Sequence, residues 1–126
     1  MRIEHAAVWV KDLNRIKKFY ETYFGATSGE LYHNEKTGFT SYFLSFDTGA
    51  RLEIMNKAEL HTNNDVTLGY AHLAFGVGTE KDVDQLTEKI VKAGYPLLNG
   101  PRVTGDGYYE AVIADPEGNL IEITTD

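Results

Sequence analysis

The sequence predicts an α+β fold made of two tandem βαβββ modules, and three observations support this class. Short apolar strand candidates and two amphipathic helical segments follow in the order strand, helix, three strands, and this order occurs twice. The spacing is similar in the two copies, since Gly25 comes 20 residues after His5 and Gly94 comes 22 residues after His72. A length of 126 residues suits one domain with a buried core.

The first module is predicted at about residues 1–57. Residues 3–10 are apolar-rich and short enough for a strand. Asp12 is a good N-cap for a helix whose apolar residues recur at helical spacing as far as Gly25, a typical C-terminal cap. Further strands are expected at residues 26–32, 39–46 and 50–55, with a hairpin turn at residues 47–49 between the last two.

The second module is predicted at about residues 69–126 and repeats this order. A strand is expected at residues 70–77, and Thr79 and Asp82 resemble a capping box that starts the second helix. Gly94 should end this helix. Further strands are expected at residues 97–104, 108–115 and 120–124, with a turn at residues 115–119 between the last two.

The two modules are expected to form a single domain over residues 1–126. Each is short and has an apolar face, so each should need the other to cover it. Residues 58–68 are polar and rich in turn-forming types, and we interpret them as the linker between the modules.

Composition and charge exclude several classes of function. The chain has no cysteine, which excludes disulfides, thiolate metal sites and a cysteine nucleophile. A net charge of -7 opposes binding to nucleic acid or to anionic membranes. No apolar stretch is long enough to span a bilayer, and the first residues lack the apolar segment of a secretory signal. We therefore expect a cytoplasmic protein with neither nucleic-acid nor membrane partners.

Each module carries one histidine and one glutamate on the strand face opposite its aliphatic residues. Because strand side chains alternate between faces, His5 and Glu53 oppose the aliphatic face of the first module. His72 and Glu122 stand at the matching positions of the second module. A single His or Glu of this kind is usually a solvated group. Solvation alone does not readily explain the same pair repeated at matching positions.

These residue types indicate a divalent metal ion. Neutral imidazole and carboxylate suit Ni, Co, Zn, Mn or Fe. Four such ligands around an octahedral ion leave two positions for water or substrate, which is typical of a catalytic site. The sequence therefore predicts a metal site with the ligands His5, Glu53, His72 and Glu122.

The same residues resemble those of the vicinal oxygen chelate (glyoxalase/bleomycin resistance/dioxygenase) superfamily, over essentially the whole chain. The resemblance is carried by Glu53 in Arg-Leu-Glu-Ile-Met, His72 in Ala-His-Leu-Ala-Phe, Glu122 in Asn-Leu-Ile-Glu-Ile, and His5 on the first strand. By ligand type the chain is most similar to glyoxalase I, lactoylglutathione lyase. The resemblance implies a curved mixed sheet around a metal-binding cavity, and one divalent ion per site. Ni, Co and Zn are favoured, and Mn and Fe remain open.

The resemblance also implies a reaction and an assembly. A glyoxalase I-like lyase or isomerase moves a proton between neighbouring carbons of a 2-oxoaldehyde–thiol adduct, through a metal-stabilised enediolate. Glu122 is the first choice for the catalytic base, with Glu53 as its counterpart in the other module. A homodimer is implied, and in some members of the family two chains share each site.

One position departs from the glutathione-using members of the family. They carry an arginine four residues after the first metal histidine, where this chain has Trp9. Tryptophan cannot make the charged bidentate contact that arginine makes with a carboxylate. Arg102 and Arg51 are the candidates to replace it, and Trp9, Arg102 and Tyr108 are expected in the substrate pocket. The thiol is therefore glutathione or another small thiol.

Three classes of function remain open. The first is the glyoxalase I-like enzyme. The second is a metal enzyme of the same fold acting on a different small substrate, either an epimerase or an antibiotic-modifying transferase. The third is a metal-free protein that binds a drug, as bleomycin resistance proteins do, although the four predicted ligands argue against it.

Overall fold

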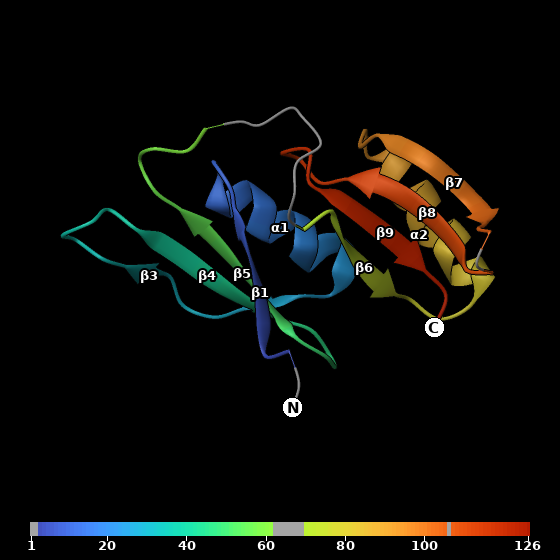
Figure 1. Ribbon diagram of the computed structural model, residues 1–126, viewed down its shortest axis with the longest axis horizontal. Helices are drawn as coiled ribbons and strands as arrows, with labels where there is room; N and C mark the ends of the chain where they lie inside the picture. The colour runs from blue at the N-terminus through green and yellow to red at the C-terminus, as the bar shows by residue number, and fades with distance from the viewer. Residues whose placement is uncertain (1–2, 62–69, 106) are drawn as a thin grey trace. The chain divides into compact units, whose positions relative to one another are not determined.

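The computed structural model describes residues 3–61, 70–105 and 107–126, in two compact units, Met1–Val66 and Thr67–Asp126 (Figure 1). Most of the predicted linker, residues 62–68, lies outside the described residues, as does Gly69. The first unit contains β1 (His5–Trp9), α1 (Leu13–Phe24), β2 (Thr27–Ser28), β3 (Tyr32–His33), β4 (Thr40–Ser45) and β5 (Arg51–Asn56). The second contains β6 (His72–Gly76), α2 (Glu80–Lys92), β7 (Leu97–Val103), β8 (Tyr109–Ala114) and β9 (Leu120–Thr124). The predicted α+β class is confirmed.

Each unit has one mixed sheet in which the first strand pairs with the last. In the first unit the strand order is β1-β5-β4-β2, and β3 also pairs with β4. In the second unit the order is β6-β9-β8-β7. The pairs β1–β5 and β6–β9 are parallel, and the other pairs are antiparallel. A parallel pair needs a long crossover connection, and the helix of each unit lies within it.

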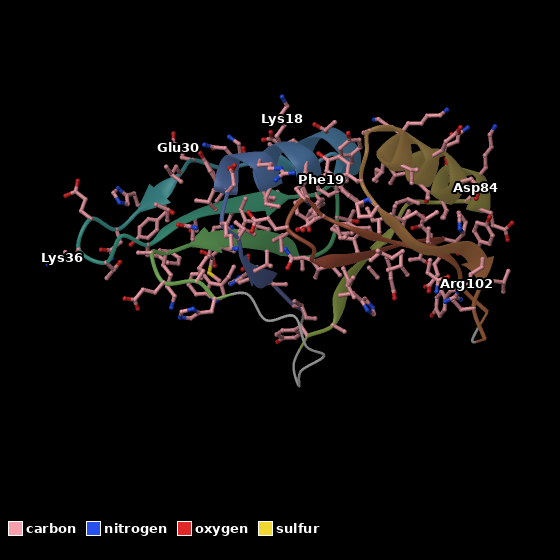
Figure 2. All side chains as sticks on the ribbon, turned by 90° about the horizontal axis from the view of Figure 1, so that it is seen from above. Lys18, Phe19, Glu30, Lys36, Asp84 and Arg102 are labelled. Carbon is pink, nitrogen blue, oxygen red and sulfur yellow. The ribbon has the colours of Figure 1, made fainter. Side chains whose placement is uncertain are left out.

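Helix α1 begins and ends where the sequence predicts. The Asp12 side chain accepts a hydrogen bond from the backbone N–H of Arg15, and Gly25 has the left-handed φ of 64° that favours glycine. The helix contacts β4 and β5 and buries its apolar stripe, whereas Lys18 points away from the sheet (Figure 2). The core of this unit is formed by Val10, Ile16, Phe19, Tyr20, Leu44, Leu52 and Ile54.

Helix α2 begins with the predicted capping box. The Thr79 side chain accepts from the backbone N–H of Asp82, and the Asp82 carboxylate accepts from that of Thr79. The pKa of Asp82 is lowered, first by a hydrogen bond that the Thr79 hydroxyl donates to its carboxylate and second by the one from the Thr79 backbone N–H. Beyond the helix, Gly94 has a φ of 93°. The core here is formed by Val83, Ile90, Ala111, Ile113, Ile121 and Ile123. Neither helix within the described residues is long and apolar enough to cross a membrane.

Residues 26–32 form two short strands instead of the single strand that the sequence predicts. Ser28 pairs with Leu44, but Tyr32 pairs with Ser41, so three intervening residues face two on β4. The extra residue interrupts the ladder as a β-bulge does. The backbone N–H of Gly29 still donates to the carbonyl of Phe43, at 2.9 Å, which keeps the segment on the sheet edge.

Strand β7 is also irregular, and its irregularity depends on a glycine. The register against β8 shifts between Asn99 and Arg102. Gly100, between them, has a φ of 77°, and a Cβ added there would lie 2.5 Å from the Glu110 carbonyl oxygen. Only glycine allows both this conformation and this approach of two backbones.

The turn between β8 and β9 is organised by a buried aspartate. Asp115 is 3% exposed, and its carboxylate accepts from the backbone N–H groups of Glu117 and Asn119 and from the Asn119 side chain. Burial raises the pKa of Asp115, and these hydrogen bonds oppose the rise only in part. Its counterpart Asp47, in the shorter turn between β4 and β5, is exposed.

We predict that Gly100→Ala lowers the free energy of unfolding by about 1–3 kcal/mol, because the added methyl group must displace backbone atoms. Gly105→Ala is the control, since nothing lies within 4 Å of a Cβ at that position. It should change the free energy by less than about 0.5 kcal/mol. Urea denaturation followed by circular dichroism measures both, and equally small effects would contradict the constraint at Gly100.

We predict that Asp115→Asn gains stability relative to the wild type as the pH rises from about 3 to about 7. Asp in the unfolded chain loses its proton near pH 3.9, whereas native Asp115 holds it to higher pH. The native state therefore binds more protons in this range, and stability falls as the pH rises through the native pKa. Thermal unfolding across this range measures the difference. Asp47→Asn serves as the exposed control, and parallel curves for wild type and Asp115→Asn would refute the prediction.

Candidate metal centre

The register of the parallel pairs places a histidine and a glutamate on one face of each sheet. Residues opposite each other in neighbouring strands share a face, and faces alternate along a strand. In the first unit, Ala7 is opposite Glu53, so His5, two residues before Ala7, shares the face of Glu53. The buried side chains of Leu52 and Ile54 occupy the other face, against α1. The sheet thus presents the predicted ligands on the side away from its helix.

The second unit repeats this register. Ala74 is opposite Glu122, and His72 lies two residues before Ala74. Ile121 and Ile123 are fully buried on the other face, which α2 covers. The same two-residue offset therefore relates histidine to glutamate in both units.

The two pairs differ in separation. His72 Nε2 lies 3.1 Å from Glu122 Oε2, whereas His5 Nε2 lies 4.0 Å from Glu53 Oε2. Both histidine side chains are about 40% exposed, and the glutamates are 15% exposed at Glu53 and 21% at Glu122. Solvent and small ligands can therefore reach the imidazoles, while the carboxylates are more enclosed.

These separations fit two ligands of one ion. Metal–ligand bonds of about 2.0–2.1 Å place neighbouring ligand atoms about 2.8–3.4 Å apart, from octahedral to tetrahedral geometry. The His72–Glu122 pair already has this spacing, which a hydrogen bond would also explain, and the His5–Glu53 pair needs a small closure. Within the described ranges, no group of three or more His, Cys, Asp or Glu side chains could hold an ion. Each pair by itself thus offers two protein ligands.

A further carboxylate contacts His5, and sequence reasoning did not find it. Glu4 Oε2 lies 2.6 Å from His5 Nδ1, and Glu4 Oε1 lies 2.6 Å from Arg51 Nη2. The hydrogen bonds from His5 and Arg51 lower the pKa of Glu4. The available signal was an acid next to the predicted metal-binding histidine, and an arginine on the strand that carries Glu53. A histidine that binds a metal through one ring nitrogen commonly donates a hydrogen bond from the other nitrogen to such a carboxylate.

Trp9 belongs to an aromatic cluster on the same face as His5. Its side chain is 44% exposed, its ring meets Phe39 edge-on at 6.1 Å, and Lys57 Nζ lies 4.9 Å from the ring centre. Phe39 also contacts Tyr32, at 6.0 Å. We call Trp9, Phe39 and Tyr32 the aromatic row. The aromatic row can make apolar contact with a ligand, and the Lys57 ammonium group lies beside it.

The other two pocket candidates lie in the second unit. Arg102 is opposite Glu110, which the register places on the same face as Glu122, away from α2 and its Asp84 (Figure 2). Arg102 Nε donates to the Asn99 side chain at 3.1 Å. Tyr108 precedes β8 and is exposed.

Comparison with known proteins agrees with this architecture. Residues 2–123 match the Glyoxalase/Bleomycin resistance protein/Dioxygenase superfamily. The metallothiol transferase FosB of Lysinibacillus sphaericus is 27% identical over 123 residues, which are 98% of this chain and 81% of that protein.

Two solved structures are similar to this chain. The trypanothione-dependent glyoxalase I of Leishmania major has a TM-score of 0.80 and 26% identity, covering 99% of this chain and 86% of that one. The fosfomycin resistance protein FosX of Listeria monocytogenes, complexed with Mn(II), has a TM-score of 0.75 and 25% identity, covering 98% and 91%. Members of the matched superfamily are usually metal-dependent enzymes. The chain belongs to the glyoxalase/bleomycin resistance protein/dioxygenase superfamily.

Proposed function

We propose that this chain is a glyoxalase I-like metal enzyme that moves a proton between neighbouring carbons of a 2-oxoaldehyde–thiol adduct. The observation that carries the proposal is the pair of histidine and glutamate at the same register in both units, on the face away from the helix. A site needs the two pairs together, supplied by one chain or by two chains of a homodimer.

In this proposal one divalent ion per site is held by His5, Glu53, His72 and Glu122. Imidazole and carboxylate donors suit Ni, Co and Zn, and also Mn, the metal of the similar FosX structure. The ion would supply a Lewis acid that stabilises negative charge developing on the substrate oxygens. These donors fit such an ion because each is a partly exposed side chain on a strand, which fixes its backbone position.

The protein's own part in the reaction is the movement of a proton. Glu122 is proposed as the base that takes the proton from one carbon and returns it to the next, with Glu53 as its counterpart. Glu122 is partly enclosed beside His72, within reach of a small substrate. A carboxylate in this role must be free to accept the proton at one of its oxygens.

A second candidate is a metal-dependent thiol transferase that inactivates an antibiotic. It is favoured by the match to the metallothiol transferase FosB over nearly the whole chain. The two candidates differ chemically, because a glyoxalase exchanges a proton at carbon, whereas a thiol transferase forms a new carbon–sulfur bond. Both require the metal, so metal binding is tested first and substrate second.

The thiol need not be glutathione. Trp9 is itself uncharged where the glutathione-using relatives have an arginine. The aromatic row offers apolar contact there, and the Lys57 ammonium group lies beside the Trp9 ring. This surface suits a substrate with an apolar group next to an anionic one. We therefore propose a thiol other than glutathione, or a weak glutathione site.

We predict about one divalent ion per four-residue site in wild-type protein purified without chelator, measured by plasma mass spectrometry. Glu122→Gln should weaken binding by more than about 100-fold, since even the loss of a carboxylate that only orients a ligand costs about 10–100-fold. Glu88→Gln on α2, whose side chain pairs with Lys92, should leave it unchanged.

The reloaded enzyme then separates the two candidates. Turnover of methylglyoxal plus glutathione with Ni or Co, lost in Glu122→Gln, supports the glyoxalase. Turnover of fosfomycin plus a thiol instead supports the transferase. A wild-type protein that binds none of Ni, Co, Zn or Mn overturns both.

We predict that Trp9→Arg binds glutathione about 10-fold more tightly than wild type, because a charge-assisted hydrogen bond to a carboxylate contributes about 1.5–3 kcal/mol. Isothermal titration calorimetry measures this without any need for turnover. Trp9→Phe keeps the aromatic contact without adding charge and should bind no better than wild type. An equal affinity in all three proteins would show that this position does not face the thiol.

A further inference from the structure

Glu4 determines which nitrogen of His5 carries the hydrogen. Glu4 Oε2 lies 2.6 Å from His5 Nδ1, and an ionised carboxylate can only accept a hydrogen bond. The Arg51 guanidinium, with Nη2 2.6 Å from Glu4 Oε1, favours the ionised form of this carboxylate. Nδ1 must therefore be the donor, and neutral His5 has its lone pair at Nε2.

That lone pair faces another acceptor. Nε2 lies 4.0 Å from Glu53 Oε2, too far for a hydrogen bond. Two electron-rich atoms that face each other across this gap repel unless a proton or another positive group lies between them. The geometry that Glu4 imposes thus prepares His5 to bind a cation together with Glu53.

Four side-chain contacts form a ring around Glu4, from Glu4 to Arg51, Arg51 to Phe43, Phe43 to His5, and His5 back to Glu4. Its Oε1 accepts from both Arg51 Nε at 2.8 Å and Arg51 Nη2 at 2.6 Å. The Arg51 guanidinium lies over the Phe43 ring at 4.1 Å, and Phe43 meets the His5 ring edge-on at 5.3 Å. The backbone N–H of Arg51 also donates to the Glu4 carbonyl. An exposed carboxylate would otherwise sample many rotamers, and this ring holds it against Nδ1.

Among the described residues of the second unit, no such arrangement is present. The residue before His72 is Ala71, and Leu120 occupies the register position that Arg51 has in the first unit. Neither can accept or donate through its side chain. In the part of the chain that the structure describes, an acid lies beside Nδ1 of His5 but not of His72, so the second histidine serves as an internal comparison.

We propose that Glu4, braced by Arg51, is a positioning residue that holds His5 as the Nδ1–H tautomer and presents Nε2 for metal binding. The statement about metal rests on the function proposed above, whereas the statement about the tautomer does not.

The tautomer is tested on the metal-free protein by long-range 1H–15N correlation spectra, at a pH where the histidines are neutral. We expect His5 of the wild type to carry its hydrogen on Nδ1. Glu4→Ala should move it to Nε2, the nitrogen that free histidine side chains favour in water, while His72 stays unchanged. Glu4→Gln should restore Nδ1–H, because its amide oxygen can also accept. A wild-type His5 with its hydrogen on Nε2 overturns the proposal.

Metal affinity is tested by competition with a chelator. Glu4→Ala should weaken binding by about 10–100-fold, the usual cost of losing such a carboxylate. Glu4→Gln should weaken it less. Glu30→Ala, an exposed acid of the same unit, controls for net charge and should change little. If Arg51 acts through Glu4, Arg51→Met should weaken binding, and adding it to Glu4→Ala should have little further effect.

The outcomes separate this inference from the proposed function. If Glu4→Ala changes the tautomer yet binds metal as tightly as wild type, while Glu122→Gln loses it, the positioning role is wrong and the proposed function stands. If the wild type binds no metal, the proposed function fails, and the statement about metal here fails with it.

Discussion

The parallel pairing of the first and last strand in each unit is the interaction on which the rest of the structure depends. It joins the two ends of each unit in one sheet, and its register decides which side chains share a face. A slip by one residue would turn every side chain of the strand to the other face. The buried isoleucines on the helix side oppose such a slip, because it would expose them and bury charged groups. The hydrophobic core therefore fixes the histidine–glutamate pairs indirectly.

The two units share this scaffold but differ in what surrounds it. Glu4 and Arg51 flank His5, whereas Ala71 and Leu120 occupy the matching positions near His72. Asp115 is buried within its turn, whereas Asp47 is exposed. A repeated topology thus carries two chemically distinct halves. Such differences allow one histidine to be held rigidly and the other to depend mainly on its glutamate partner.

The sequence predicts well the features that depend on neighbours in the chain. The caps of both helices are local hydrogen bonds, and Asp12, Gly25, Thr79 and Asp82 act as expected. Alternation along each strand likewise predicts the face of the four site residues. The interruption between β2 and β3 and the irregular register of β7 were not predicted, because they are properties of pairing with another strand. The Glu4–Arg51 contact joins residues 47 apart and has no local signature.

The parallel pairing also has a consequence for the order of events during folding. His5 and Glu53, and likewise His72 and Glu122, lie at opposite ends of their units, so they meet only when a long loop closes. Closing about 50 residues costs roughly 3.5 kcal/mol of chain entropy beyond a constant, before the strand contacts compensate for it. Local hairpins can form earlier, since their contact order is low. Each histidine–glutamate pair is therefore complete only when its unit is folded, and a partly folded chain does not present the pair to an ion.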